Sequence, residues 1–196
     1  MPRLIHLNGP PGIGKSTLAQ LYVEDHPGVL NLDIDVLRGM IGGSRRRFAQ
    51  TGEIVRPIAI AMAGTQLVAG YDVVMPQYLG RLSEIERFEA VARHSGASFC
   101  EIMLMDTKER SLERFTRRSE VAELAWHVHV QQVVADNGGL PLLADMHDRL
   151  TDVLHARPRA AVIASTEGAV QETYWLLAEV LDAGFDLGDH ETTLGR

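Results

Sequence analysis

The sequence has little of several features that would place a protein in a specialised class. It contains a single cysteine, Cys100, which therefore cannot form an intrachain disulfide. No apolar run approaches the roughly 20 residues that a membrane-spanning helix needs, and the N-terminus lacks a charged segment followed by a cleavage site. These absences predict a cytoplasmic protein that does not bind a membrane. Cys100 lies inside an apolar run and is expected to be a buried thiol rather than a nucleophile.

Basic residues are also few. The 19 Lys and Arg residues against 26 Asp and Glu residues give a formal net charge of −7. Broad, nonspecific binding to nucleic acid needs an excess of positive charge, so the composition argues against it but leaves a local basic groove open. The sequence also lacks internal repeats and low-complexity linkers. We expect one domain over residues 1–184, with a lid and helical insertion at about 110–145, and a flexible tail over residues 185–196.

Apolar segments alternate with segments of helical pattern along the chain. Strands are expected at 3–8, 28–33, 71–76, 98–105 and 159–164. Helices are expected at about 15–25, 35–41, 52–69, 82–95, 107–118, 121–135, 142–156 and 167–182. This alternation predicts an α/β fold with a mostly parallel sheet covered by helices on both faces. In such sheets ligands bind at the carboxyl ends of the strands.

The most specific motif is the segment Gly9–Thr17, which fits G-x-x-x-x-G-K-[ST] at every position. It follows an apolar strand and opens a helix, which is the context that a phosphate-binding loop requires. Its glycines free the backbone to point consecutive N–H groups at phosphate oxygens, and the helix N-terminus adds further donors. We expect Lys15 to bind the β- and γ-phosphates and Ser16 to bind Mg²⁺. The residues expected to contact a nucleoside triphosphate are Gly9, Gly12, Ile13, Gly14, Lys15, Ser16 and Thr17.

A second cluster of charged residues follows the second expected strand. Asp33 and Asp35 would point to the same side if the strand extends that far, and Arg38 would share a face with Asp35 on the next helix. One carboxylate could hold Mg²⁺, for which we favour Asp33, and the other could accept the proton of an attacking hydroxyl. Asp35 could also be only an N-cap for a helix that begins at Val36, and the two roles are compatible.

These motifs resemble those of the small P-loop kinases of the adenylate-kinase-like branch, with an AAA-type ATP-binding domain. The similarity is to the polynucleotide 5′-hydroxyl kinase and zeta-toxin or chloramphenicol phosphotransferase-like group, and it covers residues 1–118 and 159–182. It implies a three-layer P-loop kinase fold, a sheet of order 2-3-1-4-5 and a small helical lid. It also implies ATP and Mg²⁺ as cofactors, Asp35 as the general base and Arg38 as a contact to the acceptor.

The segment after the fourth strand is rich in arginine. Arg110, Arg114 and Arg117 recur at helical spacing and form one stripe. In the resembled kinases this helix leads to a lid whose arginine closes over the phosphates, so Arg117 and Arg118 are the main lid candidates, with Arg114 behind them. The alternative is a solvated helix whose arginines pair with the helix's own glutamates, Glu109 and Glu113.

Other positions carry weaker signals. No acidic residue follows the third strand, where many P-loop proteins have one, so Mg²⁺ would depend on Ser16, water and Asp33. Gln77, at that position, would contact the acceptor or simply end the strand. In the resembled kinases the loop after the fifth strand borders the nucleotide base, which implies a contact from Thr166 to the base; Thr166 could instead cap the last helix. His127 and His129 have no evident companion ligands and are expected to be structural or surface residues.

The segment 42–47 contains three consecutive arginines, which suit an anionic acceptor or a solvated loop.

The preferred hypothesis is an ATP-dependent phosphotransferase with a small hydroxyl-bearing acceptor. The alternatives are a polynucleotide 5′-hydroxyl kinase, in which the partner is a nucleic-acid end, and a regulatory NTPase without an acceptor. The sequence leaves open the acceptor, the choice between ATP and GTP, and the oligomeric state.

Overall fold

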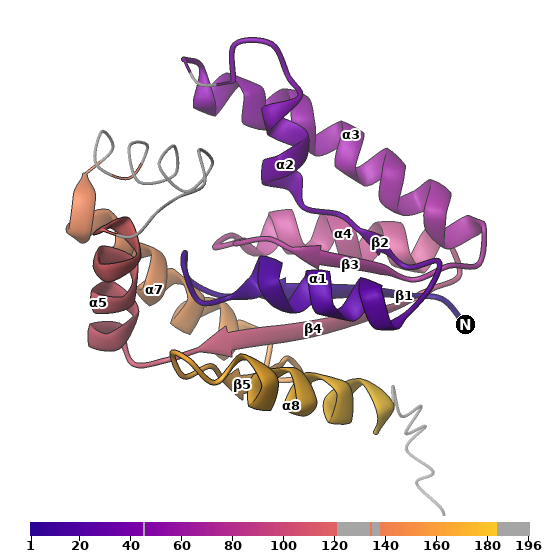
Figure 1. Cartoon of the computed structure of the whole chain (residues 1–196). Helices are drawn as coiled ribbons and strands as arrows, with labels where there is room; N and C mark the ends of the chain where they lie inside the picture. Colours follow the sequence, from indigo (N-terminus) through magenta and orange to yellow (C-terminus); the bar gives the residue numbers. More distant parts are fainter. Residues whose placement is uncertain (45, 121–133, 135–137, 184–196) are drawn as a thin grey trace, which may run out of the picture.

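A computed structural model describes residues 1–44, 46–120, 134 and 138–183 of the chain (Figure 1). The tail expected over 185–196, the pair His127 and His129, and nearly all of the helix expected at 121–135 lie outside the described residues. Along the described part, no helix has the combination of length and apolar character that crossing a membrane would require.

The five expected strands form one parallel sheet in the order β2-β3-β1-β4-β5, which confirms the predicted fold class and strand order. β1 lies at the centre of the sheet, between β3 and β4, so the loop that follows it emerges at the middle of the carboxyl edge. The strands are β1 (Arg3–Asn8), β2 (Leu30–Asn31), β3 (Val73–Pro76), β4 (Ser98–Met105) and β5 (Ala161–Ala164).

Helices cover both faces of the sheet, because alternate residues of its strands are apolar on opposite sides. In β1, Leu4 packs into the cluster beneath α3, α4 and α7, whereas Ile5 packs into the cluster beneath α1 and α8. The helices are α1 (Lys15–Asp25), α2 (Ile34–Gly39), α3 (Phe48–Val68), α4 (Leu82–His94), α5 (Lys108–Glu120), α7 (Gly139–Ala156) and α8 (Val170–Asp182).

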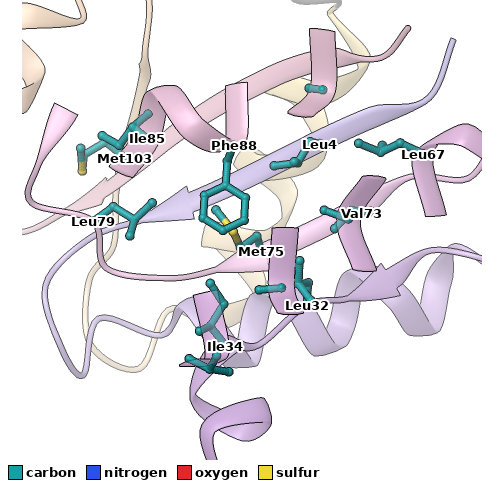
Figure 2. Packing of buried hydrophobic residues seen from close by; sticks show 14 of the residues in the cluster. Leu4, Leu32, Ile34, Leu67, Val73, Met75, Leu79, Ile85, Phe88 and Met103 are labelled. Atoms are coloured by element: carbon teal, nitrogen blue, oxygen red, sulfur yellow. The ribbon is translucent and has the colours of Figure 1, made fainter. Parts of the chain in front are cut away.

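The core cluster beneath α3 and α4 supports the carboxyl edge of the sheet. Figure 2 shows the ring of Phe88 in the middle of this cluster, close to Met75 of β3. Ile34 from the start of α2 and Leu79 from the segment after β3 belong to the same cluster. The first turn of α2 and the segment between β3 and α4 are thus fixed to one apolar base.

The expected boundaries are wrong in two places that affect the site. The second strand is shorter than the expected 28–33, because the chain turns at Asp33 into α2. α3 begins at Phe48 rather than near residue 52 and continues through Pro57. The segment between α2 and α3 is therefore shorter than the sequence suggested.

Candidate functional site

The glycine loop connects β1 to α1 as the motif predicted. Gly14 occupies the N-cap of α1 with φ 105° and ψ 9°, a left-handed conformation that side chains disfavour. The Lys15 ammonium donates hydrogen bonds to the carbonyl oxygens of Gly9 (2.8 Å) and Pro10 (2.9 Å). The lysine side chain therefore lies back across the loop, with its charge beside the backbone that would surround a phosphate.

Asn8, the last residue of β1, fixes the start of this loop. Its side-chain oxygen accepts hydrogen bonds from the N–H of Gly9 (2.9 Å) and of Leu79 (3.0 Å), and its amide donates to the Leu79 carbonyl (2.9 Å). Asn8 is fully buried, so these bonds satisfy groups that water does not reach. Sequence reasoning missed this residue. The available signal was a polar side chain at the end of an apolar strand, directly before the glycine motif.

The Ser16 hydroxyl donates a hydrogen bond to Asp33 over 3.0 Å. The other oxygen of Asp33 accepts from the N–H groups of Asp35 (3.0 Å) and Val36 (3.2 Å), so Asp33 is the N-cap of α2. The expectation that Asp35 caps this helix was wrong, as was the picture of both carboxylates on one extended strand. Because β2 ends early, Asp33 caps the helix and Asp35 lies in its first turn. The two oxygen groups expected to bind Mg²⁺, those of Ser16 and Asp33, are nevertheless adjacent.

Asp35 and Arg38 form an ion pair at 3.1 Å on one face of α2, which places them together as the spacing predicted. The Asp35 side chain is 31% exposed, whereas that of Arg38 is 8% exposed. Burial lowers the pKa of Arg38; Asp35 opposes this shift and the nearby Arg56 of α3 adds to it. Arg38 therefore lies between a carboxylate at the site and a second cation from another helix.

The arginine-rich helix α5 lies beyond the end of β4 (Figure 1) and contacts the glycine loop. Arg114 donates to the Ser165 carbonyl over 2.9 Å, and the Ser165 hydroxyl donates to the Ile13 carbonyl over 2.9 Å. Phe115 lies near Gly12. Three segments that are distant in the sequence, the glycine loop, α5 and the segment after β5, thus meet in one place. Sequence reasoning did not anticipate the role of Ser165.

A hollow lies between α5 and the segment after β5, and two of its lining arginines were expected lid residues. Arg117 forms an ion pair with Glu167 at 2.9 Å across it, and Arg110 lies 3.9 Å from Asp106. Within the described part of the chain, Arg110 and Arg117 pair with Asp106 and Glu167, which lie outside the helix, rather than with Glu109 or Glu113. The Arg118 side chain is not among the described ones. The hollow is lined by Asp106, Arg110, Glu113, Arg114, Arg117, Thr166 and Glu167.

A second hollow lies on the opposite side of the glycine loop, between α2, α3, α4 and the segment after β3. Gln77 and Tyr78 form part of its wall. The Nε2 atom of His6, which is buried in β1, donates to the Gln77 carbonyl over 2.9 Å. Tyr78 donates to the Met146 carbonyl over 3.3 Å, and burial raises the pKa of Tyr78 to about 12. The complete lining is Ile34, Arg38, Arg56, Ile60, Gln77, Tyr78, Leu79, Glu84, Arg87 and Phe88.

Two further expectations concern residues away from these hollows. Cys100 is buried in the sheet, which confirms the expected buried thiol, and burial raises its pKa to about 11. In the segment 42–47, Arg46 and Arg47 are exposed and line neither of the two hollows, and Arg45 lies outside the described residues.

Residues 4–135 match the AAA domain family AAA_33. The chain belongs to this family. The match covers the glycine loop, α2 and the arginine-rich helix, and it agrees with the resemblance to small P-loop kinases. No curated protein matches the sequence significantly.

Solved structures with the same fold extend over almost the whole length of this AAA domain protein. A candidate kinase from Chloroflexus aurantiacus J-10-fl is 18% identical, with a TM-score of 0.64 over 93% of this chain and 97% of the other. A gluconokinase from Sinorhizobium meliloti 1021 is 17% identical, with a TM-score of 0.59 over 93% and 95%. The tunicamycin resistance protein of Deinococcus radiodurans is 17% identical, with a TM-score of 0.56 over 92% and 96%. These similarities establish a P-loop kinase-like fold.

Proposed function

We propose that this protein is an ATP-dependent phosphotransferase that moves the γ-phosphoryl group to a hydroxyl of a small molecule. The observation that carries the proposal is the hydrogen bond between Ser16 and Asp33. It joins the glycine loop, which suits a triphosphate, to the turn of α2 that presents Asp35 and Arg38. A loop that only bound nucleotide would not need a carboxylate and a guanidinium held next to it.

The glycine loop is the proposed donor site. Its backbone N–H groups and the N-terminus of α1 would bind the phosphates, and Lys15 would exchange its two carbonyl contacts for β- and γ-phosphate oxygens. The hollow beside Thr166 and Arg114 is the proposed position of the base and ribose. It adjoins the loop through the contact between Ser165 and Ile13.

The donor atoms of Ser16 and Asp33 fit Mg²⁺, which prefers oxygen ligands and keeps several waters. The described residues contain no cluster of three or more metal-binding side chains. A magnesium site of few protein ligands, completed by phosphate and water, agrees with this composition. When bound, the ion would neutralise charge on the phosphates.

Asp35 is the proposed general base and Arg38 orients it through their ion pair. The acceptor hydroxyl would lose its proton to Asp35 as its oxygen bonds to the γ-phosphorus. The bond from that phosphorus to the β-phosphate oxygen would break and leave ADP. Asp35 is partly exposed, so an acceptor can approach it.

Arg114, Arg117 and Arg118 are the proposed lid cations. Arg114 already lies near Gly14 of the phosphate loop, and Arg117 borders the same hollow as Thr166. A guanidinium that reaches the transferring group would stabilise its developing charge. Arg117 would have to leave Glu167 to do so, which is a modest change for an exposed ion pair.

A substitution at Asp35 tests the proposal. We expect Asp35→Asn to lower phosphoryl transfer by about 10²- to 10⁴-fold, the usual contribution of general acid–base catalysis, while ATP binding measured by calorimetry stays nearly unchanged. Asp152→Asn, at an exposed position of α7, is the control. The assay measures ADP release over a panel of small hydroxyl compounds. Full transfer activity in the Asp35 variant would show that the base is wrong, and transfer only to water would indicate an NTPase without an acceptor.

The exposed Arg46 and Arg47 are the one observation that favours a polynucleotide 5′-hydroxyl as the acceptor. Binding of an oligonucleotide through such residues should weaken steeply as salt rises, because phosphate contacts release counterions. A binding titration with a 5′-hydroxyl oligonucleotide, repeated at about 50–300 mM salt, tests for this dependence. A neutral small acceptor should bind equally well across the same range.

A further inference from the structure

The hollow between α2, α3 and α4 adjoins the proposed base, and its wall is unusually cationic for a protein of net charge −7. Three guanidinium groups, those of Arg38, Arg56 and Arg87, border it, and Glu84 is the one carboxylate in the lining. When Asp35 is included, the cations still outnumber the carboxylates. This arrangement is local, because the sequence as a whole has more acidic than basic residues.

Two of these arginines converge although they come from different helices. A methyl group placed on Gly52 would lie 3.4 Å from the Arg38 guanidinium and 3.8 Å from that of Arg56. The two cations therefore approach the same point on α3. Bringing like charges together in a half-buried site is unfavourable unless anions accompany them. Asp35 pairs with Arg38 and Glu84 pairs with Arg56 at 3.0 Å.

Arg87 completes the group from α4. It borders the same hollow, and it takes part in none of the ion pairs found in the described portion of the chain. The hollow thus has a cation without a fixed carboxylate beside two cations that have one each. The Arg87 side chain is exposed, so its guanidinium is free to turn toward an oxyanion bound in the hollow and to pair with it.

The wall also offers neutral polar and apolar surface. The Gln77 side-chain oxygen is buried and has no hydrogen-bond partner within the described part of the protein. An acceptor hydroxyl that is not phosphorylated would satisfy it. Phe88 and Ile34 form the apolar base of the hollow, and Figure 2 shows both within the core cluster that fixes them.

We propose that the acceptor carries an oxyanion, a carboxylate or a phosphate group, in addition to the hydroxyl that is phosphorylated. Arg87 and Arg56 bind the oxyanion, and Arg38 links this anion site to Asp35. The inference rests on the proposed function, because it assigns this hollow to the acceptor. It narrows the substrate class from hydroxyl compounds in general to small anionic ones.

The first experiment measures anion binding without any acceptor chemistry. The protein is saturated with Mg²⁺ and a non-hydrolysable ATP analogue, so that the phosphate loop is occupied. It is then titrated with methylphosphonate and, separately, with acetate, while ¹H–¹⁵N spectra are recorded. We expect saturable shifts at Gln77 and Arg87 with at least one probe, and the preferred probe distinguishes a phosphate from a carboxylate.

Two substitutions, one that removes a positive charge and one that removes a negative charge, show whether the anion binds at this hollow. Arg87→Gln should raise the Kd of the preferred anion about tenfold or more, as expected for a lost charge-assisted hydrogen bond. Arg93→Gln, on the same helix but away from the hollow, is the matched control and should leave the Kd unchanged. Glu84→Gln should lower the Kd, because it removes the carboxylate that competes for Arg56. Tighter binding in this variant is not expected from a merely structural ion pair.

The second experiment compares transfer to acceptors that differ only in charge, such as glycerol, glycerate and glycerol 3-phosphate. The anionic compounds should be phosphorylated with higher kcat/KM, and Arg87→Gln should remove this preference. Absence of saturable anion shifts, or equal shifts in the Arg87 variant, would overturn the inference. If neutral acceptors alone are phosphorylated, the inference fails and the proposed function stands. If anions bind as expected but no hydroxyl compound is phosphorylated, the anion site stands and the proposed function fails.

Discussion

Protonation of His6 should destabilise this protein strongly between about pH 6.5 and pH 4. His6 is completely buried, and burial lowers its pKa to about 4. The positive charges of Lys15 and Arg157 act in the same direction, while the carbonyl of Gln77 opposes them. The neutral ring donates from Nε2 to that carbonyl, and Nδ1 has no partner among the described residues that would accept a second proton.

The direction of the effect follows from proton binding in the two states. In the unfolded chain His6 has its ordinary pKa of 6.5, so it binds a proton as the pH falls through that value. In the folded protein His6 binds this proton only near pH 4. The free energy of unfolding therefore falls as the pH falls through this window and is restored as the pH rises. A shift of this size corresponds to a loss of about 2 kcal/mol by pH 5 and about 3 kcal/mol below pH 4.

Urea unfolding of the wild type and of His6→Gln, from pH 7.5 to pH 5, measures this contribution. Glutamine does not titrate and can still donate to the Gln77 carbonyl, so the difference in free energy between the two proteins isolates His6. His94→Gln is the control, because His94 is exposed at the end of α4. If the wild type and the His6 variant lose stability in parallel over this pH range, the buried neutral histidine is refuted.

Two further predictions concern packing. Phe88→Ala should lower the free energy of unfolding by about 3–5 kcal/mol, because the ring fills the centre of a buried cluster; urea unfolding measures it, and a loss below about 1 kcal/mol would contradict the packing. Gly9→Ala should impair folding and ATP binding together, because its Cβ would lie 2.5 Å from the Leu104 carbonyl oxygen at a φ of 150°. Calorimetric titration with ATP and thermal unfolding test this, and wild-type behaviour in both would contradict the geometry.

Much of the fold could be predicted from local patterns. The glycine loop, the strand before it and the alternation of strands and helices are encoded within short segments, and the resemblance that they carry supplied the strand order. The spacing of Asp35 and Arg38 likewise predicted that they share one face of a short helix, and the structure adds the ion pair between them.

Other parts of the site depend on contacts that no local pattern contains. Asp33 rather than Asp35 caps α2, since the exact end of β2 is set by its pairing with β3. Arg56 and Arg87 join the same hollow only because α3 and α4 pack on the same face of the sheet. Ser165 meets the glycine loop because β5 lies beside β4 in the sheet.

The position of Asn8 has a consequence for how ligands influence one another. Its single side chain bonds to Gly9, at the start of the glycine loop, and to Leu79, in the wall of the hollow proposed to bind the acceptor. A shift of either segment would strain or break its buried hydrogen bonds to the Asn8 side chain that the two segments share. Nucleotide and acceptor should therefore bind with a measurable coupling free energy, and linkage requires each to change the affinity of the other by the same factor.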